Sequence, residues 1–446
     1  MTALVVGGGL AGCEAAWQLA ERGHKVTLVE MRPVKQTPAH QTDGLAELVC
    51  TNSFKSEDLG NAHGLLKAEM RALGSVLLRA ADQTKVAAGT ALAVDRHKFS
   101  ALLEKMISGH PDITIERSEI TEVPAQPAVI ATGPLTSDAL THSIQKILGD
   151  DGLAFYDSIA PIIAHDSIDL DIAYFASRWG KGEGDDYLNC PMSQPEYEAF
   201  LAALKAADVY EGHDWENIPY FEGCLPIEVM ASRGDDTLRF GPMKPVGLRD
   251  PRTAKRPHAV VQLRREDATG QMWNMVGFQT RLRTGEQRRV FRMIPGLEHA
   301  EFLRTGSIHR NTYLNFPQRL TFYGAPQARP DIIFAGQLTG VEGYTESAAS
   351  GILAGINLDR VLRKEEPLVP PSSTMLGGLF KYLREAPPSA FQPMNSNFGL
   401  LDPLQEYVRD KGLRREKTIA RARADFENWI SNHELRLAPA ESQSIH

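Results

Sequence analysis

The stretch "ALVVGGGLAGCEAAWQLAERGHKVTLVE", residues 3–30, decides the fold class of this chain. It predicts a short apolar strand, a tight turn, a helix that ends near a glycine, and a second strand that ends in Glu30. Gly7, Gly9 and Gly12 form the pattern G-x-G-x-x-G at the turn. The first glycine allows the turn, the second lets a pyrophosphate approach the backbone, and the third lets helix and strand pack closely. The stretch therefore predicts a dinucleotide site, with phosphate at the helix N-terminus and Glu30 accepting hydrogen bonds from a ribose.

Two later segments extend this domain. Residues 121–133 predict an apolar strand that ends in Ala-Thr-Gly, and residues 330–362 predict a strand, a glycine-rich turn and a long helix. With the N-terminal unit they resemble the glutathione-reductase-like FAD proteins, whose last helix directs its N-terminus at the flavin and stabilises the reduced anion. That family usually has Gly-Asp in this turn, whereas this chain has Gly336 and Gln337. The predicted cofactor-binding residues are Gly7, Gly8, Gly9, Leu10, Ala11, Gly12, Glu30, Ala131, Thr132, Gly133, Gly336, Gln337 and Tyr344.

The sequence contains no second G-x-G-x-x-G for NAD(P)H and no redox C-x-x-C pair. We therefore expect a nicotinamide that docks loosely to reduce the flavin. The loop of residues 177–187, with Arg178 and Lys181, is a candidate for that docking, and a plain linker is the alternative.

Composition places the chain among soluble globular proteins of two or three domains. It has 446 residues, of which 42% are hydrophobic and 23% charged. There is no apolar run of membrane-spanning length and no basic leader at the N-terminus. The four cysteines form no zinc spacing, so we expect reduced thiols, no metal site and a cytoplasmic location.

The charges are unevenly distributed. Net charge is −8, yet residues 239–292 carry 13 Lys and Arg against 4 Asp and Glu, and residues 409–423 carry 7 against 2. This segregation is compatible with one basic face on an acidic body, and equally with two solvated, charge-rich stretches.

The predicted fold class is α/β, with a glutathione-reductase-like FAD-binding Rossmann domain, an inserted α+β domain and a helical C-terminal segment. The FAD-binding domain is expected in residues 1–185 and 280–366, the insertion in 186–279 and the C-terminal segment in 367–446. In the insertion, residues 258–267 and 272–282 predict antiparallel strands joined by a turn near Gly270.

The segment "YFEGCLPIE", residues 220–228, places Cys224 on a bend between a glycine and a Leu-Pro pair. Cys50 has loop-like neighbours as well. From the residues alone, each thiol is either a small buried hydrophobe or a reactive group. Cys13 and Cys190 are expected to be structural.

The whole chain resembles the folate- and FAD-dependent tRNA (uracil-5-)-methyltransferases, the TrmFO family. The resemblance rests on "VVGGGLAGCEAA", "ELVCTNSFKSE", "GEGDDYLNCPM", "FEGCLPIE", "LRFGPMKPVGL", "SIHRNTYLN" and "GQLTGVEGYTESAASG". The larger flavoproteins similar to GidA, which modify the tRNA wobble uridine, share the flavin elements but have longer C-terminal regions.

This resemblance implies methylation of uridine 54 in the tRNA T loop, with 5,10-methylenetetrahydrofolate, FAD and NAD(P)H and without a partner protein. It implies that Cys224 and Cys50 are catalytic, and we assign Cys224 as the nucleophile at uracil C6 and Cys50 as the second thiol, a proton acceptor or shield. Which thiol has which role, and whether flavin N5 carries the one-carbon unit, stay open. His309 and Arg310 are implied in folate binding. The expected phosphate contacts to tRNA are Arg281, Arg283, Arg288, Arg289 and Arg292.

Three alternatives remain at this point. They are a wobble-uridine-modifying flavoprotein similar to GidA, a simple FAD-dependent NAD(P)H oxidoreductase with structural cysteines, and a flavin-containing RNA-binding module. Salt-dependent tRNA binding and methyl transfer distinguish them.

Overall fold

A computed structural model describes residues 1–37, 39–149, 153–182, 184–210, 225–267, 269–388 and 391–437, with the backbone alone for 153–159 and 307–312. No helix among these residues has the length and apolarity needed to cross a membrane.

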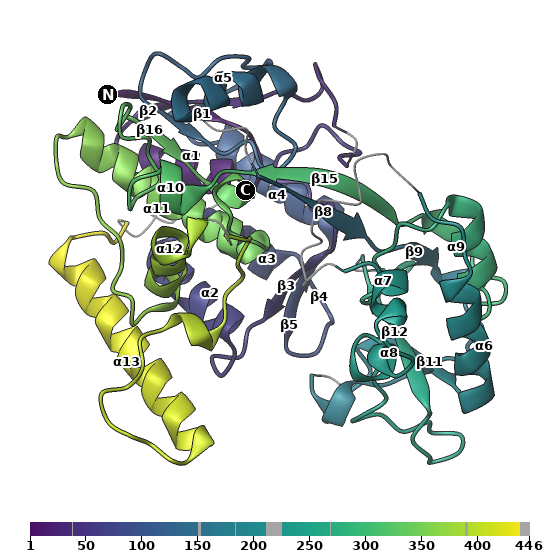
Figure 1. The fold of residues 1–446 in the computed structure, drawn as a ribbon. Helices are drawn as coiled ribbons and strands as arrows, with labels where there is room; N and C mark the ends of the chain where they lie inside the picture. Colours follow the sequence, from purple (N-terminus) through teal and green to yellow (C-terminus); the bar gives the residue numbers. More distant parts are fainter. Residues whose placement is uncertain are drawn as a thin grey trace.

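The first body is built on a five-stranded parallel sheet in the order β16-β7-β1-β2-β6 (Figure 1). Its strands are β1 (Thr2–Val6), β2 (Lys25–Glu30), β6 (Ile113–Arg117), β7 (Ala128–Ile130) and β16 (Ile332–Phe334). The three segments that predicted this domain each form the expected strand, so the parallel α/β fold is confirmed. Because all the strands run the same way, their carboxyl ends meet at one edge.

Helices cover both faces of this sheet. α5 (Asp138–Leu148) lies on one face, and α1 (Leu10–Ala20) and α11 (Tyr344–Leu362) pack against each other on the other face. A methyl group on Gly351 would clash with the Ala11 carbonyl oxygen, so glycine lets the two helix backbones approach closely. The same body contains α2 (Ala62–Ala72), α3 (Val76–Gln83), α4 (Arg96–Ser108) and a small sheet of β3 (Ser53–Ser56), β5 (Ala91–Val94) and β4 (Lys85–Val86).

The second body is an antiparallel sheet in the order β10-β11-β12-β13-β9-β14. Its strands are β9 (Ile162–Ala164), β10 (Tyr174–Phe175), β11 (Tyr187–Met192), β12 (Ala259–Arg265), β13 (Met272–Met275) and β14 (Phe302–Arg304). Its helices are α6 (Gln194–Lys205), α7 (Ile227–Ser232), α8 (Thr237–Phe240) and α9 (Thr284–Phe291). Figure 1 shows α6 and α9 on the side away from the first sheet. The predicted antiparallel pair is β12 with β13.

This second sheet extends beyond the predicted insertion of residues 186–279. β9 and β10 precede that range and β14 follows it. Strands of two or three residues are too short to show the alternation by which strands are recognised, so no local pattern indicates them.

A two-stranded ladder of β8 (Leu153–Ile159) and β15 (Ser307–Tyr313) runs between the two bodies (Figure 1). The C-terminal segment holds α12 (Met375–Glu385) and α13 (Lys411–Asn432), and α10 (Phe316–Arg319) contacts α12. Helix was predicted from about residue 403, but α13 begins at Lys411 because the Asp410 side chain accepts a hydrogen bond from the Leu413 amide and caps it.

Candidate functional site

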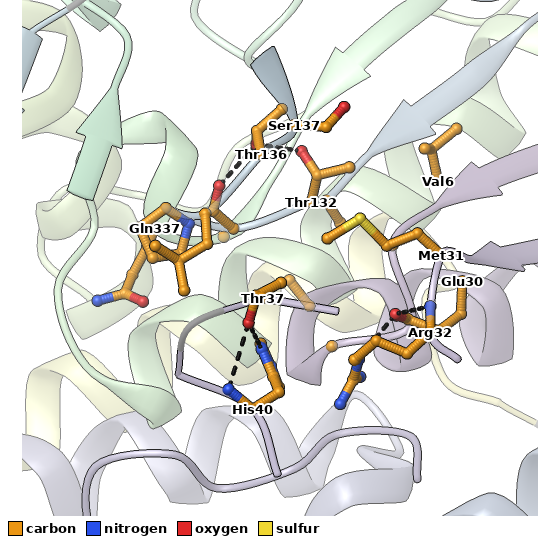
Figure 2. A pocket seen from close by; sticks show the side chains of 18 of the residues that line it. Val6, Glu30, Met31, Arg32, Thr37, His40, Thr132, Thr136, Ser137 and Gln337 are labelled. Atoms are coloured by element: carbon orange, nitrogen blue, oxygen red, sulfur yellow. Dashed lines mark hydrogen bonds and ion pairs between the residues drawn. The ribbon is translucent and has the colours of Figure 1, made fainter. Parts of the chain in front are cut away.

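A cleft opens at the carboxyl edge of the parallel sheet, and we call it the cofactor cleft (Figure 2). It encloses about 1050 Å³ of space, including its open mouth. Val6, Glu30, Ala131 and Gly336 line it, each at the end of a different strand or directly after it. Figure 2 shows Glu30 and Arg32 at one end of the cleft and Gln337 at the other. An extended ligand therefore has distinct groups to contact at its two ends.

The glycine-rich turn leaves backbone donors facing this cleft. Gly7 has φ 103°, a conformation that glycine adopts readily, and a methyl group on Gly12 would clash with the Gly7 carbonyl oxygen. α1 starts after Gly9 with no side-chain cap, and Gly9, Leu10 and Ala11 line the cleft. Uncapped amides at a helix N-terminus bind phosphate, so this end of the cleft fits the pyrophosphate of FAD.

Glu30 is buried at the end of β2 and its oxygens already have protein donors. Oε2 accepts from the Gly8 amide at 2.8 Å, and Oε1 accepts from the Arg32 amide at 3.0 Å and from Arg32 Nε at 2.8 Å. Burial opposes its ionisation, but the hydrogen bonds and charge of Arg32 and the Gly8 amide lower the Glu30 pKa below its usual value. Glu30 is thus a fixed anion that lines the cleft, and the Gly8 amide donates to this anion rather than to a ligand.

The turn after β16 forms the opposite end of the cleft. Gln337 Nε2 donates to Glu342 Oε2 at 2.9 Å, and the Gly336 amide donates to Ser350 Oγ at 2.7 Å. α11 follows with no side-chain cap. The neutral amide of Gln337 therefore keeps its carbonyl oxygen available at the cleft, where the related flavoproteins have a carboxylate.

Tyr344, the first residue of α11, ties the predicted catalytic loop to the cleft. Its hydroxyl accepts hydrogen bonds from the Cys50 amide at 2.7 Å and from the Thr51 amide at 3.1 Å. Burial, together with the nearby Cys50 charge, raises the Tyr344 pKa, so the hydroxyl stays protonated. Both Tyr344 and Val49 line the cleft, which places the Cys50 loop (residues 50–52) at its wall.

The second sheet holds this loop from the other side. Asn52 Nδ2 donates to the Val94 carbonyl at 2.9 Å and to the Arg265 carbonyl at 2.8 Å. Arg264 Nε donates to Asn52 Oδ1 at 3.0 Å, and Arg264 also hydrogen-bonds the Thr51 hydroxyl. Arg264 is 8% exposed, so this arginine of the basic stretch forms interior hydrogen bonds and is not a surface charge.

Two guanidinium groups act electrostatically on Cys50. Burial opposes the charge of Arg96, but Glu266, Tyr344 and Cys50 together raise its pKa. Burial and the neighbouring Arg96 lower the Arg304 pKa, whereas Cys50 raises it. Arg96 and Arg304 therefore both lie within electrostatic reach of Cys50.

The other predicted catalytic and folate residues cannot be placed as fully. Cys224 lies outside the described residues. The backbones of His309 and Arg310 lie on β15 opposite Asp157 and Tyr156 of β8, and their side chains are outside the described part. Both roles stay predictions.

The two cysteines expected to be structural are fully buried. Cys13 lies in α1 with its thiol directed at the Gly8 carbonyl, at 3.5 Å. Burial raises the pKa of Cys190 to about 12, so that thiol is unreactive near neutral pH.

Four of the five predicted phosphate contacts lie on one exposed helix. Arg283 precedes α9, and Arg288, Arg289 and Arg292 follow along or directly after it, all exposed. Arg281 differs, because it is half-buried with Nε 3.7 Å from Glu228 Oε1. Their binding role stays a prediction.

Arg178, predicted as a possible nicotinamide contact, has partners within the second body. Its Nε donates to Gln262 Oε1 at 2.8 Å and its Nη1 donates to the Val246 carbonyl at 2.7 Å. Lys181 is exposed. The nicotinamide-docking role of this loop stays a prediction. The exposed Lys181 is a better candidate contact than Arg178, whose guanidinium already has protein partners.

Sequence reasoning missed Arg32, Arg96, Arg264 and Arg304. Arg32 follows Glu30 by two residues, which could have suggested an ion pair. Arg96, Arg264 and Arg304 are far apart in the chain, and nothing in their local sequence indicates that they converge near Cys50.

The sheet, the glycine-rich turn and the cofactor cleft define a GidA-like FAD-binding α/β protein. A family model described as "Glucose inhibited division protein A" matches residues 2–366. The structure of GidA from Aquifex aeolicus superposes with a TM-score of 0.70 at 18% sequence identity, covering 98% of this chain and 74% of that one.

Relatives with higher sequence identity define the family within this class of proteins. Methylenetetrahydrofolate--tRNA-(uracil-5-)-methyltransferase TrmFO of Geobacter sulfurreducens is 56% identical over 428 residues, 96% of this chain and 98% of the relative. The protein of that name from Anoxybacillus flavithermus is 53% identical over 430 residues, 96% of this chain and 99% of the relative. The chain belongs to the TrmFO family.

Proposed function

We propose that this protein methylates C5 of uridine 54 in the T loop of tRNA, using 5,10-methylenetetrahydrofolate as the one-carbon donor. The observation that carries the proposal is the family membership, at 52–56% identity over 94–96% of the chain to proteins named for that reaction. These names favour it over wobble-uridine modification and over a simple oxidoreductase. The Cys50 loop at the wall of the cofactor cleft supports it.

The cleft fits FAD. The uncapped start of α1 would hold the pyrophosphate, Glu30 would hold the adenosine ribose, and Gly336 and Gln337 would contact the flavin end. When bound and reduced by NAD(P)H, FAD supplies the hydride that completes the methyl group.

Two thiols perform the covalent chemistry on the base. The Cys224 thiolate adds to uracil C6, which makes C5 nucleophilic toward the methylene carbon of the folate. Loss of the C5 proton and departure of the folate amine leave an exocyclic methylene on C5. Hydride addition to that carbon expels the sulfur from C6 and leaves the 5-methyl group. Cys50, whose backbone amide donates to Tyr344 and which lies close to the positive charges of Arg96 and Arg304, accepts the C5 proton.

The test supplies the purified protein with methylenetetrahydrofolate, NAD(P)H and tRNA that lacks the C5 methyl group. We expect 5-methyluridine at position 54, dependent on folate. Methylation with S-adenosylmethionine in place of folate would contradict the proposed donor. A Cys224→Ala variant that binds FAD and still transfers methyl at the wild-type rate would contradict the assigned nucleophile.

A further inference from the structure

A second cavity lies beside the cofactor cleft, where the first body meets the second sheet. Arg96, at the start of α4, and Glu47 line it on one side, and Ile162, Met272 and Arg304 line it on the other. It encloses about 640 Å³, including its mouth. Glu47 lines both spaces, so this inter-sheet cavity shares a wall with the cofactor cleft.

The cavity contains a buried acceptor without a donor. Arg96 Nη2 donates to Glu266 Oε2 at 2.8 Å, and Glu266 is 1% exposed. Its second oxygen, Oε1, and Arg96 Nε have no hydrogen-bond partner among the described residues. A buried carboxylate oxygen without a donor is unfavourable, so it marks a place where a ligand N–H would be stabilising.

The cavity also contains donors without acceptors. The guanidinium group of Arg304 lines it, and this partly exposed side chain forms no hydrogen bond or ion pair with any residue that the structure describes. The charge of Glu266 is already balanced by Arg96. A neutral ligand that presents one N–H and one C=O would therefore satisfy these groups, and Ile162 and Met272 supply apolar surface for its faces.

We propose that the inter-sheet cavity binds a flat heterocycle through an N–H group adjacent to a C=O group. Glu266 turns Oε1, which is shielded from solvent, toward the cavity and accepts from the N–H, and Arg96 or Arg304 donates to the carbonyl. Uracil and a pterin share this edge at N3 and O4. The inference rests on the proposed function, since that function brings both rings to the cofactor cleft. The location of the cavity near the Cys50 loop agrees with this inference, because Arg96 and Arg304 both lie within electrostatic reach of Cys50.

The test uses FAD-loaded protein and measures binding. One arm compares a T-arm RNA hairpin carrying uridine at the target position with one carrying 3-methyluridine, which lacks the N–H. The other arm measures the Kd of 5-formyltetrahydrofolate by perturbation of the flavin absorbance. Glu266→Gln keeps an acceptor for Arg96 but presents an amide NH2 in place of the free oxygen, so it cannot accept from the ring N–H.

If the cavity binds uracil, wild-type protein binds the uridine hairpin about 10-fold more tightly than the methylated one, and Glu266→Gln removes this preference. If it binds the pterin, Glu266→Gln raises the folate Kd about 10-fold and leaves the RNA preference unchanged. Either result supports the site and shows whether the bound ring is uracil or the pterin.

Arg304→Gln is the second variant, because it leaves the Arg96–Glu266 pair intact if Glu266→Gln fails to fold. Glu69→Gln is the matched control, since Glu69 of α2 is 2% exposed but its carboxylate accepts from amides at the start of α12, outside the cavity. Unchanged binding of both RNAs and of folate in folded Glu266→Gln and Arg304→Gln would overturn the inference. Wild-type protein that shows these binding effects but makes no 5-methyluridine would leave the site standing and reject the proposed function.

Discussion

At the scale of single residues, the position of Cys50 depends on groups from both bodies. Tyr344 holds its amide from the cofactor side, and Arg264 and the Arg265 carbonyl hold Asn52 of the loop from the second sheet. Arg96 and Arg304 add positive charge. A thiol on such a fixed loop, beside two cations, has the surroundings of a reactive cysteine rather than of a packing residue.

Replacing Cys50 tests its chemical role. We expect Cys50→Ala to keep FAD bound and to lower the methyl-transfer rate by about 10²- to 10⁴-fold, the contribution typical of a general acid or base. Single-turnover formation of 5-methyluridine measures the effect. Cys190→Ala, in the core of the second sheet, is the control and should keep the rate of its folded fraction. A Cys50→Ala variant with the wild-type rate would show that the thiol is dispensable.

Tyr344→Phe removes the acceptor of two amides. The Cys50 and Thr51 N–H groups then lack a partner, so the free energy of unfolding should fall by about 1–3 kcal/mol. Urea unfolding followed by circular dichroism measures it. Tyr407→Phe changes a side chain that is 90% exposed and should leave stability unchanged. Equal stabilities of the two variants would mean that the amides find other acceptors.

At the scale of helices and strands, short side chains determine how α1 meets α11. The glycines and alanines at their crossing allow a close approach that fixes where the N-terminus of α1 points. The cofactor cleft therefore depends on packing behind it as well as on the residues that line it.

Gly351→Ala tests this dependence. The added methyl group meets the Ala11 carbonyl oxygen, so we expect a loss of about 1–3 kcal/mol in unfolding free energy and weaker FAD retention. Thermal unfolding and the flavin content of purified protein measure both effects. Gly285→Ala in α9 is the matched control, because a methyl group there has open space. Equal flavin content in the two variants would show that FAD binding does not depend on the crossing of α1 and α11.

Buried glutamates connect one helix to the start of another. Glu69 of α2 accepts hydrogen bonds from the Met375 and Leu376 amides at the start of α12, both at 2.8 Å. Burial raises the Glu69 pKa from 4.5 to about 8, although these amides oppose the shift. The folded state therefore holds a proton at pH values where the unfolded chain has lost it.

This shift predicts a pH dependence of stability. Between about pH 4.5 and 8 the folded protein binds more protons at Glu69 than the unfolded chain, so its contribution to stability falls as pH rises. The slope is at most about 1.4 kcal/mol per pH unit. The difference in unfolding free energy between wild type and Glu69→Gln should decrease across this window in urea titrations at pH 5, 6, 7 and 8. A constant difference would mean that Glu69 is ionised in the fold.

At the scale of the whole molecule, the basic stretch of residues 239–292 divides between interior and surface. Arg264 is buried and holds the Cys50 loop, whereas the arginines along α9 are exposed, and α9 lies on the outer side of the second body (Figure 1). Only the exposed part of the charge is available to tRNA phosphates.

A variant with Arg283, Arg288 and Arg292 changed to Gln should bind tRNA more weakly at every sequence. Each lost phosphate contact lowers the slope of log Kd against log salt by about 0.7–0.9, so the slope should fall by up to about 2 to 3. Titrations between 50 and 200 mM salt measure it. The same changes at Arg329, Arg360 and Arg384, outside both basic stretches, are the control. An equal effect in both variants would argue against α9 as the contact surface.

The sequence was sufficient for the first body because its elements are long and carry a glycine pattern with a single physical meaning. It failed at β9, β10 and β14, whose few residues have no periodicity, and those strands set the extent of the second sheet. A family resemblance predicted a role for Cys50, a role that stays a prediction, but nothing pointed to Arg96, Arg264 or Arg304. Such residues converge only after folding, so local sequence contains no signal for them.

The tie between Asn52 and the Arg265 backbone has a mechanical consequence. The Cys50 loop is hydrogen-bonded to strand β12 through Asn52 and to the cofactor side through the Cys50 amide. Any relative movement of the two halves would therefore move the thiol as well. RNA binding would then be coupled to the position of the Cys50 thiol, and this coupling would suppress reaction at the flavin when no RNA is bound.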